Sequence, residues 1–253
     1  PPYDEIRDYN GYSFPFEDIA QELWRTTKVG GVIAEKTSRM VAPAEQIEVL
    51  VKRRFVSRGG EKLEHALDGF GISVQNRSVL DAGVSTGGFT DCVLQRGARR
   101  VFAVDVGRNQ LHEHMKSDSR VDWRDGVNVR DLVAEDCPYP CSLVVADLSF
   151  ISLTKVLDAF FASVRAEPGF DTPGMVLLVK PQFEAGRIEV SRGKGVITDP
   201  AIHQEACDTV RDAVVDLGGT VVGIIESPIK GAEGNTEFLM YVECPTRYVS
   251  CES

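Results

Sequence analysis

From residue 78 onward, short apolar runs rich in valine alternate with segments whose apolar residues recur at helical spacing. We expect the apolar runs to form strands, at residues 78–81, 100–105, 142–147, 175–180, 220–225 and 237–243. Most of them are continuously apolar, which is typical of strands that are covered on both faces. The alternation of strands and helices favours an α/β fold with a doubly wound, largely parallel sheet.

The predicted helices have recognisable ends. Apolar residues repeat at helical spacing over residues 153–164 and again over residues 202–217. The second segment follows Asp199-Pro200 and precedes Gly218-Gly219, which are typical residues at the start and the end of a helix. Shorter helices are expected over residues 61–70 and 90–95.

The last two predicted strands are joined differently from the others. Their connection contains Pro228, Gly231, Gly234 and Asn235 but no helical pattern. Since parallel strands need a long crossover, usually a helix, these two strands are predicted to form an antiparallel hairpin. The final strand then runs backwards, and Glu237 at its start lies at the edge where the parallel strands end.

The composition disfavours several classes of protein. A net charge of −10 disfavours a protein that coats nucleic acid, because such binding neutralises phosphates, although a local basic face remains compatible with it. No apolar stretch approaches the roughly 18 to 20 residues that span a bilayer, and residues 1–5 lack the pattern of a secretory signal. The six cysteines include one close pair, Cys137 and Cys141, without further ligands for a metal. We expect a cytoplasmic protein with reduced thiols and no metal.

A glycine-rich turn, residues 83–88, follows the first predicted strand and opens a helix. Its spacing matches neither the G-x-G-x-x-G turn of dinucleotide sites nor a phosphate-binding P-loop. Asp105 ends the next strand, where a carboxylate can accept hydrogen bonds from the hydroxyls of a ribose. A nucleoside cofactor without a long phosphate chain fits this pattern, and S-adenosylmethionine is such a cofactor. The alternative is a tight strand-to-helix turn with a helix-capping aspartate.

Three charged residues are predicted to meet at one edge of the sheet. Asp147 and Lys180 end two predicted strands, and Glu237 begins the antiparallel one. In an open α/β sheet, ligands bind in the crevice beyond the carboxyl ends of the strands. A lysine between two carboxylates at this edge indicates catalysis. A structural ion pair between Asp147 and Lys180 is the alternative, although buried ion pairs are weak sources of stability.

Five segments together resemble one family. They are residues 57–63 (Ser-Arg-Gly-Gly-Glu-Lys-Leu), 81–90, 146–152, 179–184 and 234–237 (Gly-Asn-Thr-Glu). In this order they are similar to the TlyA haemolysin-like family, whose members resemble FtsJ-type RNA 2′-O-methyltransferases. The resemblance implies a Rossmann-like class I methyltransferase fold with a seven-stranded, mostly parallel sheet that ends in an antiparallel hairpin. It also implies a catalytic tetrad of Lys62, Asp147, Lys180 and Glu237.

The same resemblance implies S-adenosylmethionine as cofactor and RNA as substrate. Cofactor contacts are expected from Asp81, Gly83, Ser85, Thr86, Gly87, Gly88, Phe89, Asp105, Val106, Asn128, Asp147, Ser149 and Phe150. Basic residues near the active edge are candidate RNA contacts, namely Arg53, Arg54, Arg58, Arg187, Arg192 and Lys194. Phe150 and Phe183 are placed to stack on RNA bases, or else belong to the core.

The amino-terminal quarter has a different pattern. A short helix is expected over residues 16–27 and β structure over residues 28–51. This region is similar to the back half of an S4-type RNA-binding domain, whose first helix is not recognisable in residues 1–15. We expect a partial S4-like segment at residues 1–51, a basic linker at 52–60, the methyltransferase domain at 61–245 and a tail at 246–253.

The expected function is 2′-O-methylation of RNA ribose, with ribosomal RNA or a ribosomal subunit as partner. Lys180 would act on the 2′-hydroxyl, as a base if neutral or as a stabiliser of developing alkoxide if charged, with Asp147 orienting it. Lys62 and Glu237 would position the substrate and tune the charge.

Three alternatives differ in class. One is a methyltransferase for another acceptor such as a base nitrogen, but residues 147–150 lack the two prolines that amino-directed enzymes commonly carry there. Another is a non-catalytic RNA- or ribosome-binding protein that retains the fold. The third, a membrane-lysing toxin, is disfavoured because no amphipathic or membrane-spanning segment is visible.

Overall fold

The computed structural model divides into two compact units, residues 1–54 and 55–253. It describes residues 54–170, 172–185, 195–231 and 233–245, together with the backbone of three short strands before them. In the first unit, β1 (Thr27–Val29) pairs antiparallel with both β2 (Val32–Ile33) and β3 (Ile47–Val49). The β structure expected over residues 28–51 is therefore present. The helix expected over residues 16–27 lies outside the described residues, except for Thr27, which is in β1.

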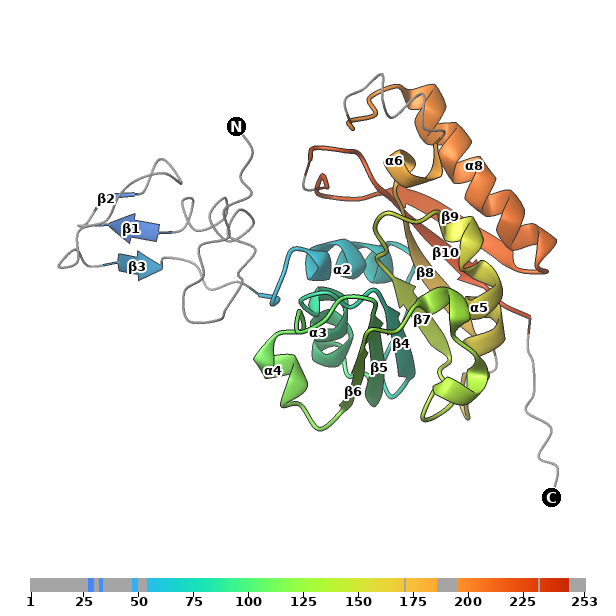
Figure 1. Ribbon diagram of the computed structural model, residues 1–253, viewed down its shortest axis with the longest axis horizontal. Helices are drawn as coiled ribbons and strands as arrows, with labels where there is room; N and C mark the ends of the chain where they lie inside the picture. Colours follow the sequence, from blue (N-terminus) through green and yellow to red (C-terminus); the bar gives the residue numbers. More distant parts are fainter. Residues whose placement is uncertain are drawn as a thin grey trace. The chain divides into compact units, whose positions relative to one another are not determined.

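The second unit is built on a seven-stranded sheet with strand order β6-β5-β4-β7-β8-β10-β9 (Figure 1). The strands are β4 (Ser78–Ala82), β5 (Arg100–Asp105), β6 (Val121–Asp125), β7 (Leu143–Ala146), β8 (Gly174–Val179), β9 (Thr220–Glu226) and β10 (Phe238–Glu243). The first five pair in parallel, whereas β10 pairs antiparallel with both β8 and β9. The predicted sheet with its terminal hairpin is confirmed.

One strand, β6, is not among the runs predicted from the sequence. Only Val121 of this strand is buried, and the next three residues are exposed. Because β6 lies at the edge of the sheet, its sequence Val-Asp-Trp-Arg-Asp does not need to be continuously apolar. A search for apolar runs therefore misses it.

Helices connect the strands and cover the sheet. The α-helices are α2 (Gly59–Gly69), α3 (Gly88–Gln95), α4 (Glu113–Lys116), α5 (Leu157–Ser163), α6 (Pro181–Glu184) and α8 (Pro200–Asp216). Three 3₁₀ turns are η1 (Val129–Asp131), η2 (Ala134–Asp136) and η3 (Leu153–Lys155). The helix predicted over residues 153–164 is thus divided into η3 and α5, and α8 begins as predicted, with Asp199 accepting from the Ala201 amide at 2.8 Å. None of the described helices combines the length and apolarity needed to cross a membrane.

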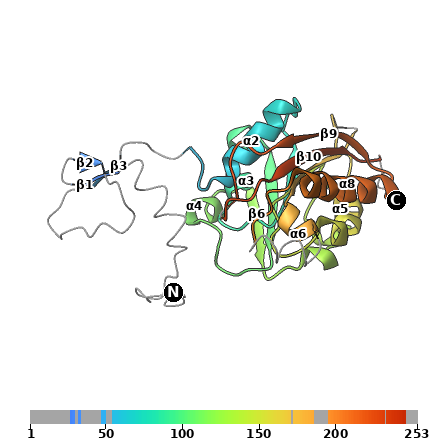
Figure 2. The ribbon, with the colours of Figure 1, turned by 90° about the horizontal axis from the view of Figure 1, so that it is seen from above.

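Alternate residues of the strands face two separate cores, one on each side of the sheet. On one side, Val79, Val145 and Leu178 pack with Leu63 of α2 and Val93 of α3. On the other side, the neighbouring strand residues pack against α5 and α8, with a core that includes Leu80, Val144, Leu177, Phe160 and Val210. Figure 2 shows these helices on both sides of the strands. Burial on both faces explains why the central strands are apolar throughout.

The first turns of α2 and α3 pack against each other. A Cβ on Gly88 would lie 3.0 Å from the Gly60 nitrogen and 2.2 Å from the Ser57 Oγ. Glycine at position 88 therefore lets the amino end of α3 approach the residues that begin α2. This contact fixes α2, which carries Lys62, beside the turn that follows β4.

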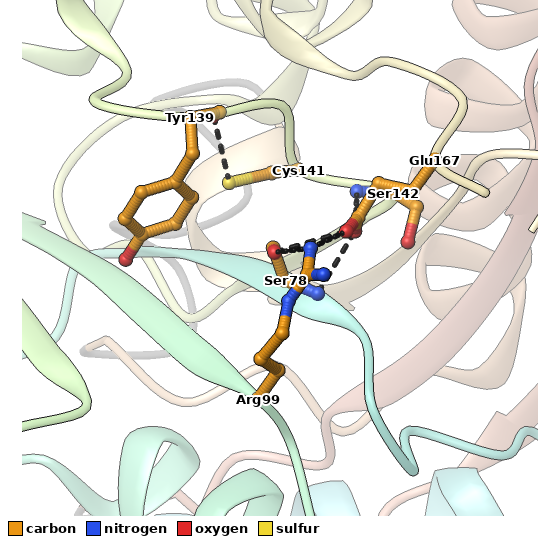
Figure 3. Close-up of polar contacts among 6 residues, drawn as sticks. All are labelled: Ser78, Arg99, Tyr139, Cys141, Ser142 and Glu167. Atoms are coloured by element: carbon orange, nitrogen blue, oxygen red, sulfur yellow. Dashed lines mark hydrogen bonds and ion pairs between the residues drawn. The ribbon is translucent and has the colours of Figure 1, made fainter.

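Glu167 ties together two strands at the opposite, amino edge of the sheet (Figure 3). Its Oε1 accepts from the amides of Ser78 at 2.8 Å and Ser142 at 3.2 Å, and its Oε2 accepts from Ser78 Oγ at 3.0 Å and Arg99 Nη2 at 2.5 Å. Ser78 begins β4 and Ser142 precedes β7. The buried carboxylate thus holds the two central strands in register at the edge away from Asp81 and Asp147.

Candidate active site

The four predicted catalytic residues come from four different elements. Lys62 lies in α2, Asp147 follows β7, Lys180 follows β8, and Glu237 precedes β10. Because Phe238 pairs with Val179, the antiparallel ladder places Glu237 next to Lys180 where the pairing ends. Asp147, Lys180 and Glu237 therefore share the carboxyl edge of the sheet, as predicted.

The four charged groups form two short ion pairs. Lys180 Nζ lies 2.6 Å from Asp147 Oδ1 and donates to Ser149 Oγ at 2.9 Å. Lys62 Nζ donates to Glu237 Oε2 at 2.6 Å. The sequence predicts Lys180 between two carboxylates, whereas in the structure Glu237 pairs with Lys62. The reason is that α2 brings a second ammonium to this edge, and strand topology alone does not reveal it.

Burial makes these pairs unusual. Lys62, Lys180 and Glu237 are all more than nine-tenths buried, and Asp147 is the most open of the four. Buried charges need partners because removing an isolated ion from water is very costly. An ammonium has three N–H groups, and two of those on Lys180 are used by Asp147 and Ser149.

Gly231 supports this arrangement and was not singled out from the sequence. A Cβ at Gly231 would lie only 2.5 Å from Glu237 Oε1. The Gly231 amide also donates to the Asn235 carbonyl at 2.9 Å, which closes the turn before Glu237. The available signal was the Gly-Ala-Glu-Gly-Asn-Thr-Glu run of residues 231–237. Glycine here leaves room for the carboxylate beside Lys62.

Two aromatic residues flank Lys180. Phe150 is 91% exposed and adopts a left-handed backbone with φ of +65°. Its ring centroid lies 5.3 Å from that of Phe183, and Lys180 Nζ lies 5.9 Å from the Phe183 centroid. Phe150 is therefore not a core residue. An exposed phenyl ring beside a buried ammonium offers a flat apolar surface to a substrate.

The glycine turn lies against the Asp147 loop. Gly83 has φ of +85°, and a Cβ there would lie 2.6 Å from the Asp147 carbonyl oxygen. The Asp105 carboxylate accepts from the amides of Ser85 at 2.8 Å and Gly107 at 2.7 Å. Both carboxylate oxygens retain lone pairs for hydroxyl donors. Asp105 is thus held at the strand end where the sequence predicts ribose recognition.

Asp81 is fully buried at the end of β4. Its Oδ2 accepts from Thr90 Oγ1 at 2.6 Å, and its buried Oδ1 has no hydrogen-bond partner among the residues that the structure describes. Burial raises the pKa of Asp81 to about 7, against the lowering effect of the Thr90 bond, and the charges of Asp147 and Asp105 raise this pKa further. Asp81 thus lies in the field of two other carboxylates, which favours a positively charged ligand.

The remaining predicted cofactor residues occupy varied positions. Thr86 accepts from the His112 amide at 3.2 Å, Gly87 precedes α3 with φ of +99°, and Phe89 is buried in the core. Val106 is 72% exposed. Asn128 accepts from the Arg130 amide at 3.2 Å and lines a pocket together with Phe102, Arg124 and Asp131.

The predicted RNA contacts are only partly described. Arg54 is exposed, and Arg58 immediately precedes α2. Arg53, Arg187, Arg192 and Lys194 lie outside the described residues.

Comparisons with known proteins show the family of this chain. Residues 55–244 match the family model described as FtsJ-like methyltransferase. The chain belongs to this family. It is 41% identical over 217 residues to Hemolysin A of Brachyspira hyodysenteriae, covering 84% of this chain and 87% of that protein. It is also 39% identical to the 16S/23S rRNA (cytidine-2′-O)-methyltransferase TlyA of Mycobacterium tuberculosis, covering 87% of this chain and 80% of the relative.

A solved hemolysin-like protein from Streptococcus thermophilus shares the fold with a TM-score of 0.75 and 38% identity, covering 90% of this chain and 82% of that one. As an FtsJ-like methyltransferase, the protein uses S-adenosylmethionine. The residues present fit this cofactor. The Oδ1 of Asp81, unpartnered within the described part of the chain, is an acceptor for a cationic donor. Gly83 leaves space beside Asp147, and Asp105 is placed for ribose hydroxyls.

Proposed function

We propose that this protein transfers the methyl group of S-adenosylmethionine to a ribose 2′-hydroxyl of ribosomal RNA. The observation that carries the proposal is the buried Lys180 ammonium, which Asp147 and Ser149 hold beside the glycine turn. A hydroxyl acceptor needs such a group, because its oxygen gains negative charge as its proton leaves. The M. tuberculosis relative is named as a (cytidine-2′-O)-methyltransferase, which supports the same acceptor.

Lys180, Asp147 and Ser149 have distinct roles in the proposed methyl transfer. Bound S-adenosylmethionine supplies a methyl group on a positively charged sulfur. As the new bond from the 2′-oxygen to this methyl forms, the carbon–sulfur bond breaks and the hydroxyl loses its proton. A neutral Lys180 accepts this proton, whereas a charged Lys180 stabilises the developing oxyanion while the proton passes to water. Asp147 and Ser149 orient Lys180 in both cases.

Lys62 and Glu237 have a different role from that of Lys180. Their ion pair neutralises two buried charges and fixes the carboxylate at the edge that Lys180 shares. We propose that this pair positions the acceptor ribose and keeps the charge of the site balanced. Positioning of the reacting groups can supply a large part of the rate acceleration.

Phe150 and Phe183 are the proposed base-binding surface. RNA-binding proteins commonly stack an unpaired base on an exposed aromatic ring. Phe150 is exposed and packs against Phe183, which lies beside Lys180. A base stacked on Phe150 would bring its own ribose close to the ammonium. The acceptor is therefore proposed to be a nucleotide whose base is unpaired when it is methylated.

The amino-terminal unit completes the proposal. We propose that residues 1–51 act as a partial S4-like RNA-binding segment, joined by the basic linker 52–60 to the methyltransferase domain, with residues 246–253 as a tail. The RNA contacts are proposed to include Arg53, Arg54 and Arg58, together with Arg187, Arg192 and Lys194. With a ribosomal substrate, the reaction is proposed to take place in the cytoplasm.

The test is methyl transfer to defined acceptors. The protein is incubated with radiolabelled S-adenosylmethionine and either ribosomal subunits, free ribosomal RNA or DNA of matched length. Label in RNA that becomes resistant to alkaline hydrolysis at one linkage supports a 2′-O-methyl product. Label at a base nitrogen contradicts the proposed acceptor, and binding to subunits without transfer of label supports a non-catalytic binding protein.

A further inference from the structure

Glu184 joins the two loops that surround Lys180. It is the last residue of α6, the short helix that begins directly after Lys180. Its Oε2 accepts from Ser152 Oγ at 2.5 Å, and its Oε1 accepts from the Leu153 amide at 2.8 Å. A single carboxylate therefore binds the loop that follows β7 to the helix that follows β8.

Ser152 and Leu153, the two residues that Glu184 binds in the loop after β7, are also held by other contacts. Ser152 is the N-cap of η3, and its Oγ also accepts from the Thr154 amide at 3.2 Å. Leu153 is 2% exposed and belongs to the core beside α5 and α8. The first amides of a helical turn have no partner within the turn, and Glu184 satisfies that of Leu153. Glu184 thus anchors the loop where it enters the core.

Phe150 lies between two fixed points of this loop. On one side, Ser149 accepts from Lys180, and on the other side Ser152 donates to Glu184. Phe150 itself has a left-handed backbone and a 91% exposed side chain. Such a conformation is unfavourable for a bulky residue and persists only when the surrounding structure enforces it. The two fixed points supply that constraint.

We propose that Glu184 is a positioning residue, whose bonds to Ser152 and Leu153 hold the Phe150 ring beside Phe183 and Lys180 so that it can receive the acceptor base. This inference rests on the proposed RNA methylation and extends it to the device that aligns the base. Glu184 acts through Phe150 and not on the reacting atoms. Loss of Glu184 therefore affects the binding of RNA and the alignment of the acceptor base, but not the binding of the cofactor.

The first experiment is steady-state kinetics with ribosomal RNA or subunits. Glu184→Ala removes both acceptors, so we expect kcat/KM for RNA to fall about 10- to 100-fold, with a raised KM for RNA and an unchanged Kd for S-adenosylmethionine. Glu184→Gln keeps an acceptor for the Leu153 amide and gains a donor for Ser152 Oγ, so it should recover most of the activity. Glu205→Ala, which removes an exposed glutamate from α8, is the matched control and should behave as wild type.

A double-mutant cycle tests whether Glu184 acts through Phe150. Phe150→Ala alone should lower kcat/KM for RNA, and adding Glu184→Ala to it should cause little further loss. If the two losses multiply, Glu184 acts independently of Phe150 and the proposal is overturned. It is also overturned if Glu184→Ala leaves kcat/KM for RNA unchanged, or if Glu184→Gln is as impaired as Glu184→Ala.

Hydrogen exchange separates this inference from the proposed function. In Glu184→Ala, the Leu153 amide should exchange faster than in wild type while the thermal transition of the whole protein changes little. Unchanged exchange at Leu153 would overturn the role of Glu184, whatever the protein methylates. Failure of the wild-type protein to methylate any RNA would instead contradict the proposed function.

Discussion

Lys62 and Glu237 are 175 residues apart in the sequence, yet their side chains form a buried ion pair of 2.6 Å. The pair joins the first helix of the methyltransferase domain to its last strand. It lies beside a second pair, Lys180 and Asp147, at the carboxyl edge of the sheet. The site therefore exists only in the folded domain, and its charges are balanced by residues from both ends of that domain.

Loss of one partner of the buried pair should be costly. Lys62→Ala leaves the Glu237 carboxylate buried without its partner, so the free energy of unfolding should fall by about 3 to 5 kcal/mol. Replacing both residues by apolar ones of similar size, as in Lys62→Met with Glu237→Leu, should restore much of the stability but no activity. Urea unfolding measures the first effect and methyl transfer the second.

Lys230→Ala is the control, since its pair with Glu226 is more than half exposed and should contribute at most about 1 kcal/mol. Equal losses in the two single variants would contradict this account.

Lys180→Ala should abolish chemistry and leave cofactor binding intact. We expect kcat to fall by a factor of about 10² to 10⁴, since the variant lacks the group that acts on the 2′-hydroxyl. Calorimetric titration with S-adenosylmethionine should give a Kd close to that of the wild type. Lys180→Arg keeps a positive charge but cannot act as a base, so residual activity in this variant would favour oxyanion stabilisation. Turnover retained in Lys180→Ala would remove Lys180 from the mechanism.

Asp81 should make cofactor binding depend on pH. Its pKa is raised to about 7, and a positively charged ligand binds better to the ionised carboxylate. Affinity for S-adenosylmethionine should therefore increase as pH rises from about 6 to about 8, with one proton released on binding at pH 6. Asp81→Asn should bind more weakly and show no such dependence. A wild-type affinity that is constant across this range would exclude Asp81 from the cofactor site.

The raised pKa of Asp81 also predicts how the stability of the cofactor-free protein depends on pH. The folded-state pKa lies above the ordinary value of 3.8, so between about pH 4 and pH 7 the folded protein holds a proton that the unfolded chain has released. The contribution of Asp81 is fully present below about pH 4 and is lost as pH rises through about 7. Asp81→Asn should flatten this slope when the free energy of unfolding is measured against pH.

Gly231→Ala should lower activity with little loss of stability. The added methyl would lie 2.5 Å from Glu237 Oε1, and the flexible carboxylate can shift slightly while keeping its pair with Lys62. Since this shift displaces the carboxylate from its place at the active edge, kcat should fall by about 10²-fold. Thermal unfolding of the variant should change by a few degrees at most. Wild-type kcat in Gly231→Ala would show that the Glu237 position is not critical.

Glu167→Ala, in contrast, should lower stability without changing the binding of RNA or cofactor. Its carboxylate accepts from Ser78, Ser142 and Arg99 (Figure 3). These contacts lie at the amino edge of the sheet, opposite the edge that carries the catalytic groups. Its removal leaves buried donors without acceptors, which should lower the free energy of unfolding by about 3 kcal/mol. KM for RNA and the Kd for S-adenosylmethionine should not change at temperatures where the variant is folded. A selective rise in either constant would indicate that this edge takes part in binding.

The fold was largely predictable because its central strands are buried on both faces. Burial requires continuous apolar runs, and these mark every strand of the large sheet except β6, whose outer position allows charged residues. The hairpin of β9 and β10 was predictable because its connection lacks a helix. This hairpin puts Glu237 at the carboxyl edge of the parallel strands, as its sequence predicts.

The site was predictable only where strand ends determine it. Asp147, Lys180 and Glu237 follow from sheet topology, whereas Lys62 lies on a helix and was identified only through the resemblance to a family. Nothing in local sequence pairs Lys62 with Glu237, or Glu184 with Ser152. These contacts depend on how helices and loops pack across the sheet, which periodicity and spacing do not report.

The most direct test of the central claim is the chemical position of the transferred methyl group. Ribosomal RNA treated with the protein and S-adenosylmethionine is digested to nucleosides, and these are identified by mass spectrometry. We expect one nucleoside with its methyl group on the ribose 2′-oxygen, absent when Lys180→Ala or Asp147→Ala replaces the wild type. A methyl group on a base, or an unchanged yield of product from both variants, would contradict the account.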